Sequence, residues 1–324
     1  MMGTDKSASP ARRLPLSFSP TVVAFAVLLL VWVITAVSID GFATKASLIQ
    51  TLQTAAFLGI IAAGQTIVVM MAGIDLSVSS TVTLSSVAAS SVMAHSGMGP
   101  YAGIAAGLGI GAAVGLVNAL GIAYLKLPPL IMTIATISLI TGFMLIATNG
   151  TPPSGMSPVL NQLANNDWFF GLPNVVFIWL VVSVFTYWFL HLSKFGRQTI
   201  ALGTNEKASV LSGVHTAKLQ MIGYSLCGLF AGLSGILQLG YMGSTYLTLG
   251  EPYQLLSIAA VVLGGTSILG GRGNYLGTIA GTLLIIILKN VLTVIDISSA
   301  GREFVMGLLI LVILFAYARE RKIR

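Results

Sequence analysis

Few side chains in this sequence could do chemistry, and they are spread thinly among apolar runs. The 324 residues include nine Asp and Glu, three His and one Cys. No two carboxylates have the spacing of a general acid and base, and there is no Walker A, HExxH or GxSxG motif. The lone Cys227 excludes an intrachain disulfide and a cysteine-based zinc cluster. We therefore expect no catalytic residue, metal site or cofactor in this chain.

Asp75, in AGIDLSVSS, is the acidic residue that comes nearest to lying within an apolar segment. Its carboxylate can accept hydrogen bonds from the first free N–H groups of a following helix, so helix capping is one interpretation. A place in a gate is the other, and the two are compatible. Ion-coupled transporters usually carry acids within their spans, so the scarcity of acids argues against proton or sodium coupling.

Neutral polar side chains within the apolar runs suit a neutral polyhydroxylated solute better than an ion, although each can instead bond a neighbouring helix. These side chains are Gln53, Gln65, Thr66, Thr133 and Thr136. Lys289, late in its run, can snorkel to the membrane surface or face a pathway.

Composition places the chain among polytopic membrane proteins. Hydrophobic residues make up 56% and charged residues 8%, with a mean hydropathy of +0.94, whereas soluble domains carry about 25% charged residues. The net charge of +7 comes from basic residues scattered at segment ends. They form no stripe for phosphates, so we expect no nucleic-acid partner and instead contact with membrane lipid.

The apolar runs predict an all-α protein of about ten transmembrane helices. They lie at 21–38, 48–72, 78–95, 100–124, 129–147, 174–192, 219–240, 254–269, 274–293 and 303–318. The first run exceeds the apolar core of a signal peptide, so we expect it to be retained, with cleavage after Ser38 as the alternative. One transmembrane domain, 21–318, then lies between tails at 1–20 and 319–324.

Charge asymmetry predicts the orientation. With ten spans, thirteen of the sixteen Lys and Arg fall on one side, which the positive-inside rule assigns to the cytoplasm together with both termini. These residues are Lys6, Arg12, Arg13, Lys126, Lys194, Arg197, Lys207, Lys218, Arg272, Arg319, Arg321, Lys322 and Arg324.

The run IAAVVLGGTSILGGRGNYLGTIAG begins and ends as a membrane helix, with a break rich in Gly, Ser and Thr between. Lipid cannot satisfy such a backbone, so the break must lie inside protein or beside water. We expect Gly264, Gly265 and Thr266 to flank a solute pathway near its cytoplasmic end, close to Asp75 and Ser77. A rigid structural turn is the alternative.

Glycines spaced by four residues predict close helix crossings, within one subunit or across a dimer interface. The spacing occurs at Gly107, Gly111 and Gly115, at Gly228 and Gly232, and at Gly277 and Gly281.

Two loops are longer than a connection requires. The outer loop, 149–174, holds four prolines and Trp168-Phe169-Phe170, which suits an interfacial aromatic belt or a docking surface for an external partner. In the cytoplasmic loop, 194–218, Asn205 or Thr204 can cap a short helix that begins near Glu206 and ends at Gly213. Such a helix is too short to be stable alone, which favours a partner groove over a solvated connector.

These motifs resemble those of permease subunits in ribose-type ATP-binding cassette (ABC) importers. The loop GRQTIALGTNEKASVLSGV resembles the family's coupling loop, AGIDLSVS its GGIDLSVG element, and AAVVLGGTSILGGRGNYLGT its AAVVLGGTS element. YSLCGLFAGLSGIL resembles the span that follows the coupling loop. The resemblance extends from about residue 45 to the C-terminus.

The resemblance implies an inner-membrane permease that carries a monosaccharide or small polyol and hydrolyses nothing itself. Its partners would be a second permease copy, an external sugar-binding protein, and two cytoplasmic ATPase subunits that hold ATP and Mg²⁺. A stand-alone secondary transporter or facilitator is the alternative. The implied ATPase-coupling residues are Gly203, Asn205, Glu206, Ala208, Leu211, Ser212 and Gly213. The expected pathway or gate residues are Gln65, Asp75, Ser77, Thr136, Gly264, Gly265 and Thr266.

The chain departs from the family pattern at three places. The family's GGN is Gly203-Thr204-Asn205, Ser79 replaces a glycine, and a paired Asn reads Lys289-Asn290. Because some such importers pair two different permeases, both a homodimer and a heterodimer stay open.

Overall fold

The computed structural model describes residues 19–95, 98–169 and 171–320, and these form a helical bundle with one small hairpin. Its helices are α1 (Pro20–Ser38), α2 (Lys45–Met70), α3 (Val78–His95), α4 (Gly99–Ala123), α5 (Pro129–Thr148), α6 (Pro158–Asn165), α7 (Asn174–His191), α8 (Lys194–Thr204), α9 (Glu206–Leu211), α10 (Thr216–Met242), α11 (Tyr253–Leu263), α12 (Tyr275–Val294) and α13 (Ser299–Glu320). Strands β1 (Asp167–Phe169) and β2 (Leu172–Pro173) pair antiparallel.

Seven of these helices are long and apolar enough to cross a membrane: α1, α2, α4, α5, α7, α10 and α12. Two shorter apolar helices, α3 and α11, fall below that length. The prediction of an all-helical membrane protein is thus confirmed, with seven spans supported by length and composition. The tail residues Lys6, Arg12, Arg13, Arg321, Lys322 and Arg324 lie outside the described residues.

Local sequence explains several helix ends. Asn205 and Asn274 cap α9 and α12, because their side chains accept hydrogen bonds from Ala208 N and Leu276 N. Helix α10 ends at Gly243, whose φ of +77° stops the helix in a conformation that suits glycine. The residues that follow, 243–252, form no helix and lead to α11, and we call them the α10–α11 linker.

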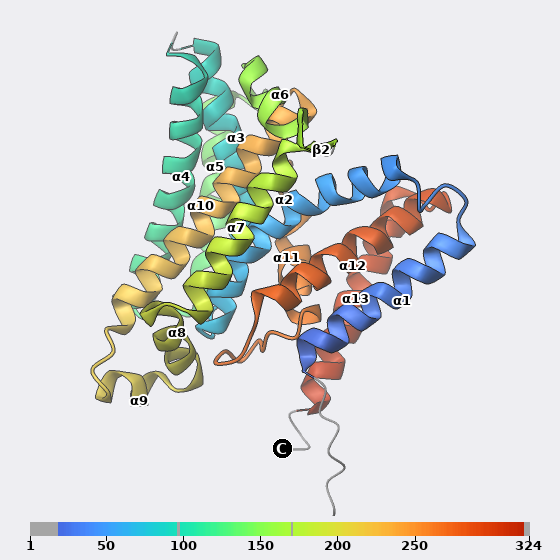
Figure 1. The fold of residues 1–324 in the computed structure, drawn as a ribbon. Coiled ribbons are helices and arrows are strands. Elements are labelled where there is room, and N and C mark those ends of the chain that lie inside the picture. The colour runs from blue at the N-terminus through green and yellow to red at the C-terminus, as the bar shows by residue number, and fades with distance from the viewer. Residues whose placement is uncertain (1–18, 96–97, 170, 321–324) are drawn as a thin grey trace, which may run out of the picture.

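The bundle has two ends and two parts (Figure 1). Helices α8 and α9 mark one end, here the α9 end, and α6 with the hairpin marks the other, the α6 end. Helices α3, α4, α5, α7 and α10 stand together, and α1, α12 and α13 lie to the other side. Helix α2 is buried from Ala55 to Met70 and packs against α7, α10, α11 and α12, so it joins the two parts.

A glycine seam holds α4 against α10. A methyl group on Gly115 would overlap the carbonyl oxygen of Tyr224, and one on Gly228 would overlap that of Gly111. Gly107 and Gly232 continue the contact. A second, shorter seam joins Gly277 of α12 to Gly264 after α11. The glycine spacing therefore serves packing within one subunit, the first of the two interpretations drawn from the sequence.

Candidate functional site

The loop between α7 and α10 projects from the α9 end as two helices (Figure 1). Ser193 caps α8, since its Oγ accepts from Gly196 N at 3.2 Å. Asn205 caps α9 through Ala208 N at 3.0 Å, and Gly213 follows the helix with a φ of +80°. The short capped helix predicted from Asn205 to Gly213 is present, and the preceding residues, which were not predicted to be helical, form α8.

Helix α9 presents an apolar tip to the outside. The Leu211 side chain is 89% exposed and Val210 is 54% exposed, although both are large and apolar. All of the predicted coupling residues from Asn205 to Gly213 are exposed, and Gly203 is buried. An apolar tip on a short, rigidly capped helix is a typical anchor for a partner groove.

Gly203, near the end of α8, is buried where three chain segments meet. A methyl group here would overlap the carbonyl oxygen of Met70, which also accepts a hydrogen bond from Gly271 N at 3.0 Å. A methyl group on Gly271 would overlap the Thr204 side chain, and one on Gly270 would touch Ala72. We call this meeting of Met70–Ala72, Gly203–Thr204 and Gly270–Gly271 the three-way junction.

Two of the three segments that meet at the three-way junction have unusual backbone geometry. Ala72, Gly270 and Gly271 have φ values of +61°, +80° and +71°, and an alanine at positive φ is uncommon. The residues just before the GIDLSVS element, Met70–Ala72, lie beside the end of the GGTSILGG break, and the end of α8 contacts both segments.

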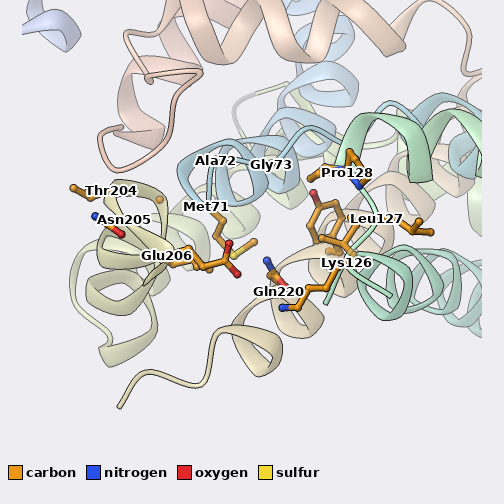
Figure 2. Close-up of a pocket in the computed structure, with 15 residues that line it drawn as sticks. Met71, Ala72, Gly73, Lys126, Leu127, Pro128, Thr204, Asn205, Glu206 and Gln220 are labelled. Carbon is orange, nitrogen blue, oxygen red and sulfur yellow. The ribbon is translucent and has the colours of Figure 1, made fainter. Parts of the chain in front are cut away.

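A cavity of about 360 Å³ opens beside the junction at the α9 end (Figure 2). Glu206, Gln220 and Lys126 extend into the same space, and the α4–α5 turn with Pro128 closes one side. Neither Gln220 nor the Lys126-Leu127-Pro128-Pro129 turn was predicted to be part of a site. The paired prolines were the available signal that the chain turns here.

A chain of buried side chains links α3, α4 and α5. Ser77 donates to the Asp75 carboxylate through its Oγ at 2.6 Å and its N–H at 2.9 Å. Asn118 donates to Ser77 Oγ at 2.7 Å and accepts from Thr136 Oγ1 at 2.6 Å. Asp75 thus binds the backbone just before α3, as the capping interpretation requires.

The residues expected along a pathway are mostly buried within this one chain. Exposure of the side chain is at most 5% for Gln65, Asp75, Ser77, Thr136 and Thr266. Gln53, Thr66 and Thr133 bond neighbouring helices or their own backbone. Among the described residues, no group of three or more His, Cys, Asp or Glu could hold a metal ion.

Comparison with known proteins identifies the class. Residues 47–314 match the family model described as the permease component of the branched-chain amino acid transport system. The chain belongs to this family, and it is a multi-pass inner-membrane transport subunit of an ABC importer rather than an enzyme.

Individual relatives are import permeases. The ribose import permease protein RbsC of Bacillus subtilis is 36% identical over 273 residues, 84% of each chain. RbsC of Escherichia coli K12 is 36% identical over 295 residues, 88% of this chain and 89% of that protein. LsrC, the autoinducer 2 import system permease protein of Escherichia coli O9:H4, is 32% identical over 200 residues, 62% of this chain and 58% of its own length. No solved structure matches the chain significantly.

Proposed function

We propose that this chain forms the membrane pathway of an importer for a monosaccharide or a similar small polyol. The observation that carries the substrate class is the 36% identity to two ribose import permeases over most of the chain. A stand-alone facilitator would have no use for an exposed, capped α9 helix.

The proposed topology has ten crossings. To the seven long apolar helices we add α3, α11 and α13, with the non-helical segments before α3 and α11 completing those crossings. Both described chain ends then lie at the α9 end with α8 and α9 (Figure 1). We assign this end to the cytoplasm because Lys126, Lys194, Arg197, Lys207 and Lys218 also gather there.

The proposed partners attach at opposite ends. Two ATPase subunits carrying ATP and Mg²⁺ would receive α9, whose exposed Leu211 and Val210 would fill an apolar groove. A second permease copy, identical or different, would complete the pathway. An external sugar-binding protein would dock at the α6 end, where Trp168 is 74% exposed and Phe169 is 60% exposed.

The three-way junction suggests how ATP hydrolysis reaches the pathway. A partner that displaces α9 also displaces Gly203, which touches the end of α2 and the break after α11 through backbone atoms. Backbone contacts leave no flexible side chain to absorb the movement. Asp75, Ser77, Gly264, Gly265 and Thr266 lie next to the segments that would move, and this supports a role for them in gating.

Substrate class is tested by uptake into cells that express the chain together with its cognate ATPase and binding protein. We expect uptake of labelled D-ribose or another aldose to exceed that of L-leucine at least tenfold, with leucine chosen because of the family description. Uptake of leucine and not of any monosaccharide would overturn the proposed substrate.

The coupling role of α9 is tested with Leu211→Glu. Removing one exposed apolar anchor weakens a partner interface by about 1–3 kcal/mol, or roughly 5- to 150-fold in affinity. The purified variant should unfold at the same temperature as the wild type, because Leu211 makes little contact within this chain. Pull-down of the ATPase measures the loss, and Glu303→Gln, an exposed residue on α13, is the control. Unchanged ATPase binding by the Leu211→Glu variant would show that the loop only connects α7 to α10.

A further inference from the structure

The α10–α11 linker runs along α3 rather than across an end of the bundle. Ser86 Oγ donates to Thr245 Oγ1 at 2.8 Å, and Gly250 N donates to Thr83 Oγ1 at 3.0 Å. A methyl group on Gly250 would overlap the carbonyl oxygen of Ser79. These contacts descend α3 from its middle to its first turn, so the linker lies parallel to the helix.

The start of α3 lies well inside the bundle. Ser77, just before α3, is bonded to Asn118, which is bonded to Thr136. Asn118 is five residues from the end of α4, and Thr136 is seven residues from the start of α5. At about 1.5 Å per residue, this level is roughly 8–10 Å inside the α9 ends of those helices. Gly250, beside the first turns of α3, is therefore near mid-depth.

The length of α11 also indicates that the linker lies near mid-depth in the membrane. Its 11 residues extend about 16 Å, roughly half of the hydrocarbon core of a membrane, which is about 30 Å thick. A crossing that consists of α11 alone is incomplete. The linker must cover the other half as non-helical backbone.

Lipid cannot surround such a backbone. In the described part of the chain, the N–H groups of Tyr246 and Thr248 bond to no protein acceptor, and both residues are exposed. Glu251 is also exposed, and a carboxylate at this depth is costly in lipid. Irregular backbone within a membrane persists where protein buries it or where it lines water. The exposed face of the linker therefore lies against water or against a second protein chain, and not against lipid.

We propose that the α10–α11 linker and the first turn of α11 form a wall of the solute pathway, with Tyr246, Thr248, Glu251 and Gln254 facing a neutral polyhydroxylated solute. The Glu251 carboxylate accepts hydrogen bonds from hydroxyl groups, and Thr248 and Gln254 both donate and accept. The Tyr246 ring, 40% exposed, offers an apolar surface to the C–H face of a sugar. This inference rests on the proposed function and adds residues distinct from the buried ones named above.

Cysteine labelling tests the position of the linker. Thr248→Cys is made in a Cys227→Ala background, and the complex with its ATPase is placed in nanodiscs, where both membrane faces are accessible. Ser257→Cys on α11, with a fully buried parent side chain, and Leu139→Cys on α5, with a 73% exposed apolar parent, are the matched controls. A thiol reacts with a charged maleimide as the thiolate, which forms in water and not in lipid or a packed core.

We expect Thr248→Cys to react at least tenfold faster than either control. D-Ribose at high concentration, or a transported aldose found in its place, should slow that reaction. A Thr248→Cys thiol as inert as the Ser257→Cys thiol, in resting and ATP-trapped complexes alike, would overturn the proposal.

Glu251→Gln tests the solute contact with a nearly isosteric change. Loss of a charge-assisted hydrogen bond should lower the maximal uptake rate at least tenfold, while the ATPase activity stimulated by the loaded binding protein persists. Glu303→Gln on α13, also exposed, is the matched control and should transport normally. An uptake rate of the Glu251→Gln variant equal to that of the wild type would contradict the contact between Glu251 and the solute.

The two proposals fail in different ways. If wild-type cells take up no monosaccharide but Thr248→Cys labels rapidly, the substrate class is wrong and the linker still lines water. If wild-type cells take up a monosaccharide but the Thr248→Cys thiol is inert, the importer stands and the pathway lies elsewhere.

Discussion

The glycine seam between α4 and α10 and the three-way junction use the same residue type for different purposes. In the seam, Gly111, Gly115 and Gly228 lie in continuous helices, and each helix packs directly on the other's backbone. In the junction, Gly203 is the next-to-last residue of α8, while Gly270 and Gly271 lie in a loop with positive φ. Close approach between two continuous helices makes a rigid scaffold. Close approach between helix ends and a loop makes a contact that can shift.

The largest effect is expected in the seam. Gly228→Val places a β-branched side chain against the Gly111 carbonyl, and two long helices cannot separate locally. We expect a loss of more than about 3 kcal/mol in folding free energy, because overpacking of this kind displaces backbone. The yield of folded protein after detergent extraction measures it. Gly109→Ala, in open space on α4, is the control. Equal yields for Gly228→Val and wild type would contradict the scaffold role.

An intermediate effect is expected in the junction. Gly203→Ala also creates an overlap, but α8 lies at the edge of the bundle and can move as a short unit. We predict folded protein at more than half of the wild-type yield, with uptake reduced at least tenfold. The exposed Ala201→Ser, two residues earlier, should behave as wild type. A Gly203→Ala variant with normal uptake would show that the junction is not a link, and one that fails to fold would make it part of the scaffold.

The smallest effect is expected at the helix cap beside the junction. Asn205→Ala removes the acceptor for Ala208 N and should destabilise α9 by about 1 kcal/mol. The free energy of global unfolding should hardly change, because α9 lies at the periphery of the bundle. Amide hydrogen exchange in residues 206–211 should become about fivefold faster. Asn205→Ser, which can still cap, should retain slow exchange, and identical exchange in both variants would argue against the cap.

The sequence predicted features that depend on neighbours along the chain. The cap at Asn205 and the end at Gly213 follow from local chemistry, and glycine spacing predicted the seam. The pairing of the two breaks was predicted, but the contact is between Met70–Ala72 and Gly270–Gly271. No rule of spacing could choose those residues, since it is tertiary packing that brings them together.

The position of the α10–α11 linker in the membrane is the feature that could least be predicted from the sequence. Residues 243–252 are polar and contain turn-forming glycines, so they read as an ordinary surface loop between two apolar runs. A local pattern carries no information about depth. Depth follows from the Ser86–Thr245 and Thr83–Gly250 bonds, which join residues more than 150 positions apart.

The coupling loop is held at both of its ends, so the part that can move lies between them. Helix α10 starts a few residues after α9 and is fixed against α4 by the seam. Helix α8 packs on α7, where a methyl group on Gly196 would overlap the carbonyl oxygen of Leu190. We therefore expect a force applied at α9 to displace the segment from Gly203 to Asn205, so that the displacement is delivered to the end of α2 and the break after α11.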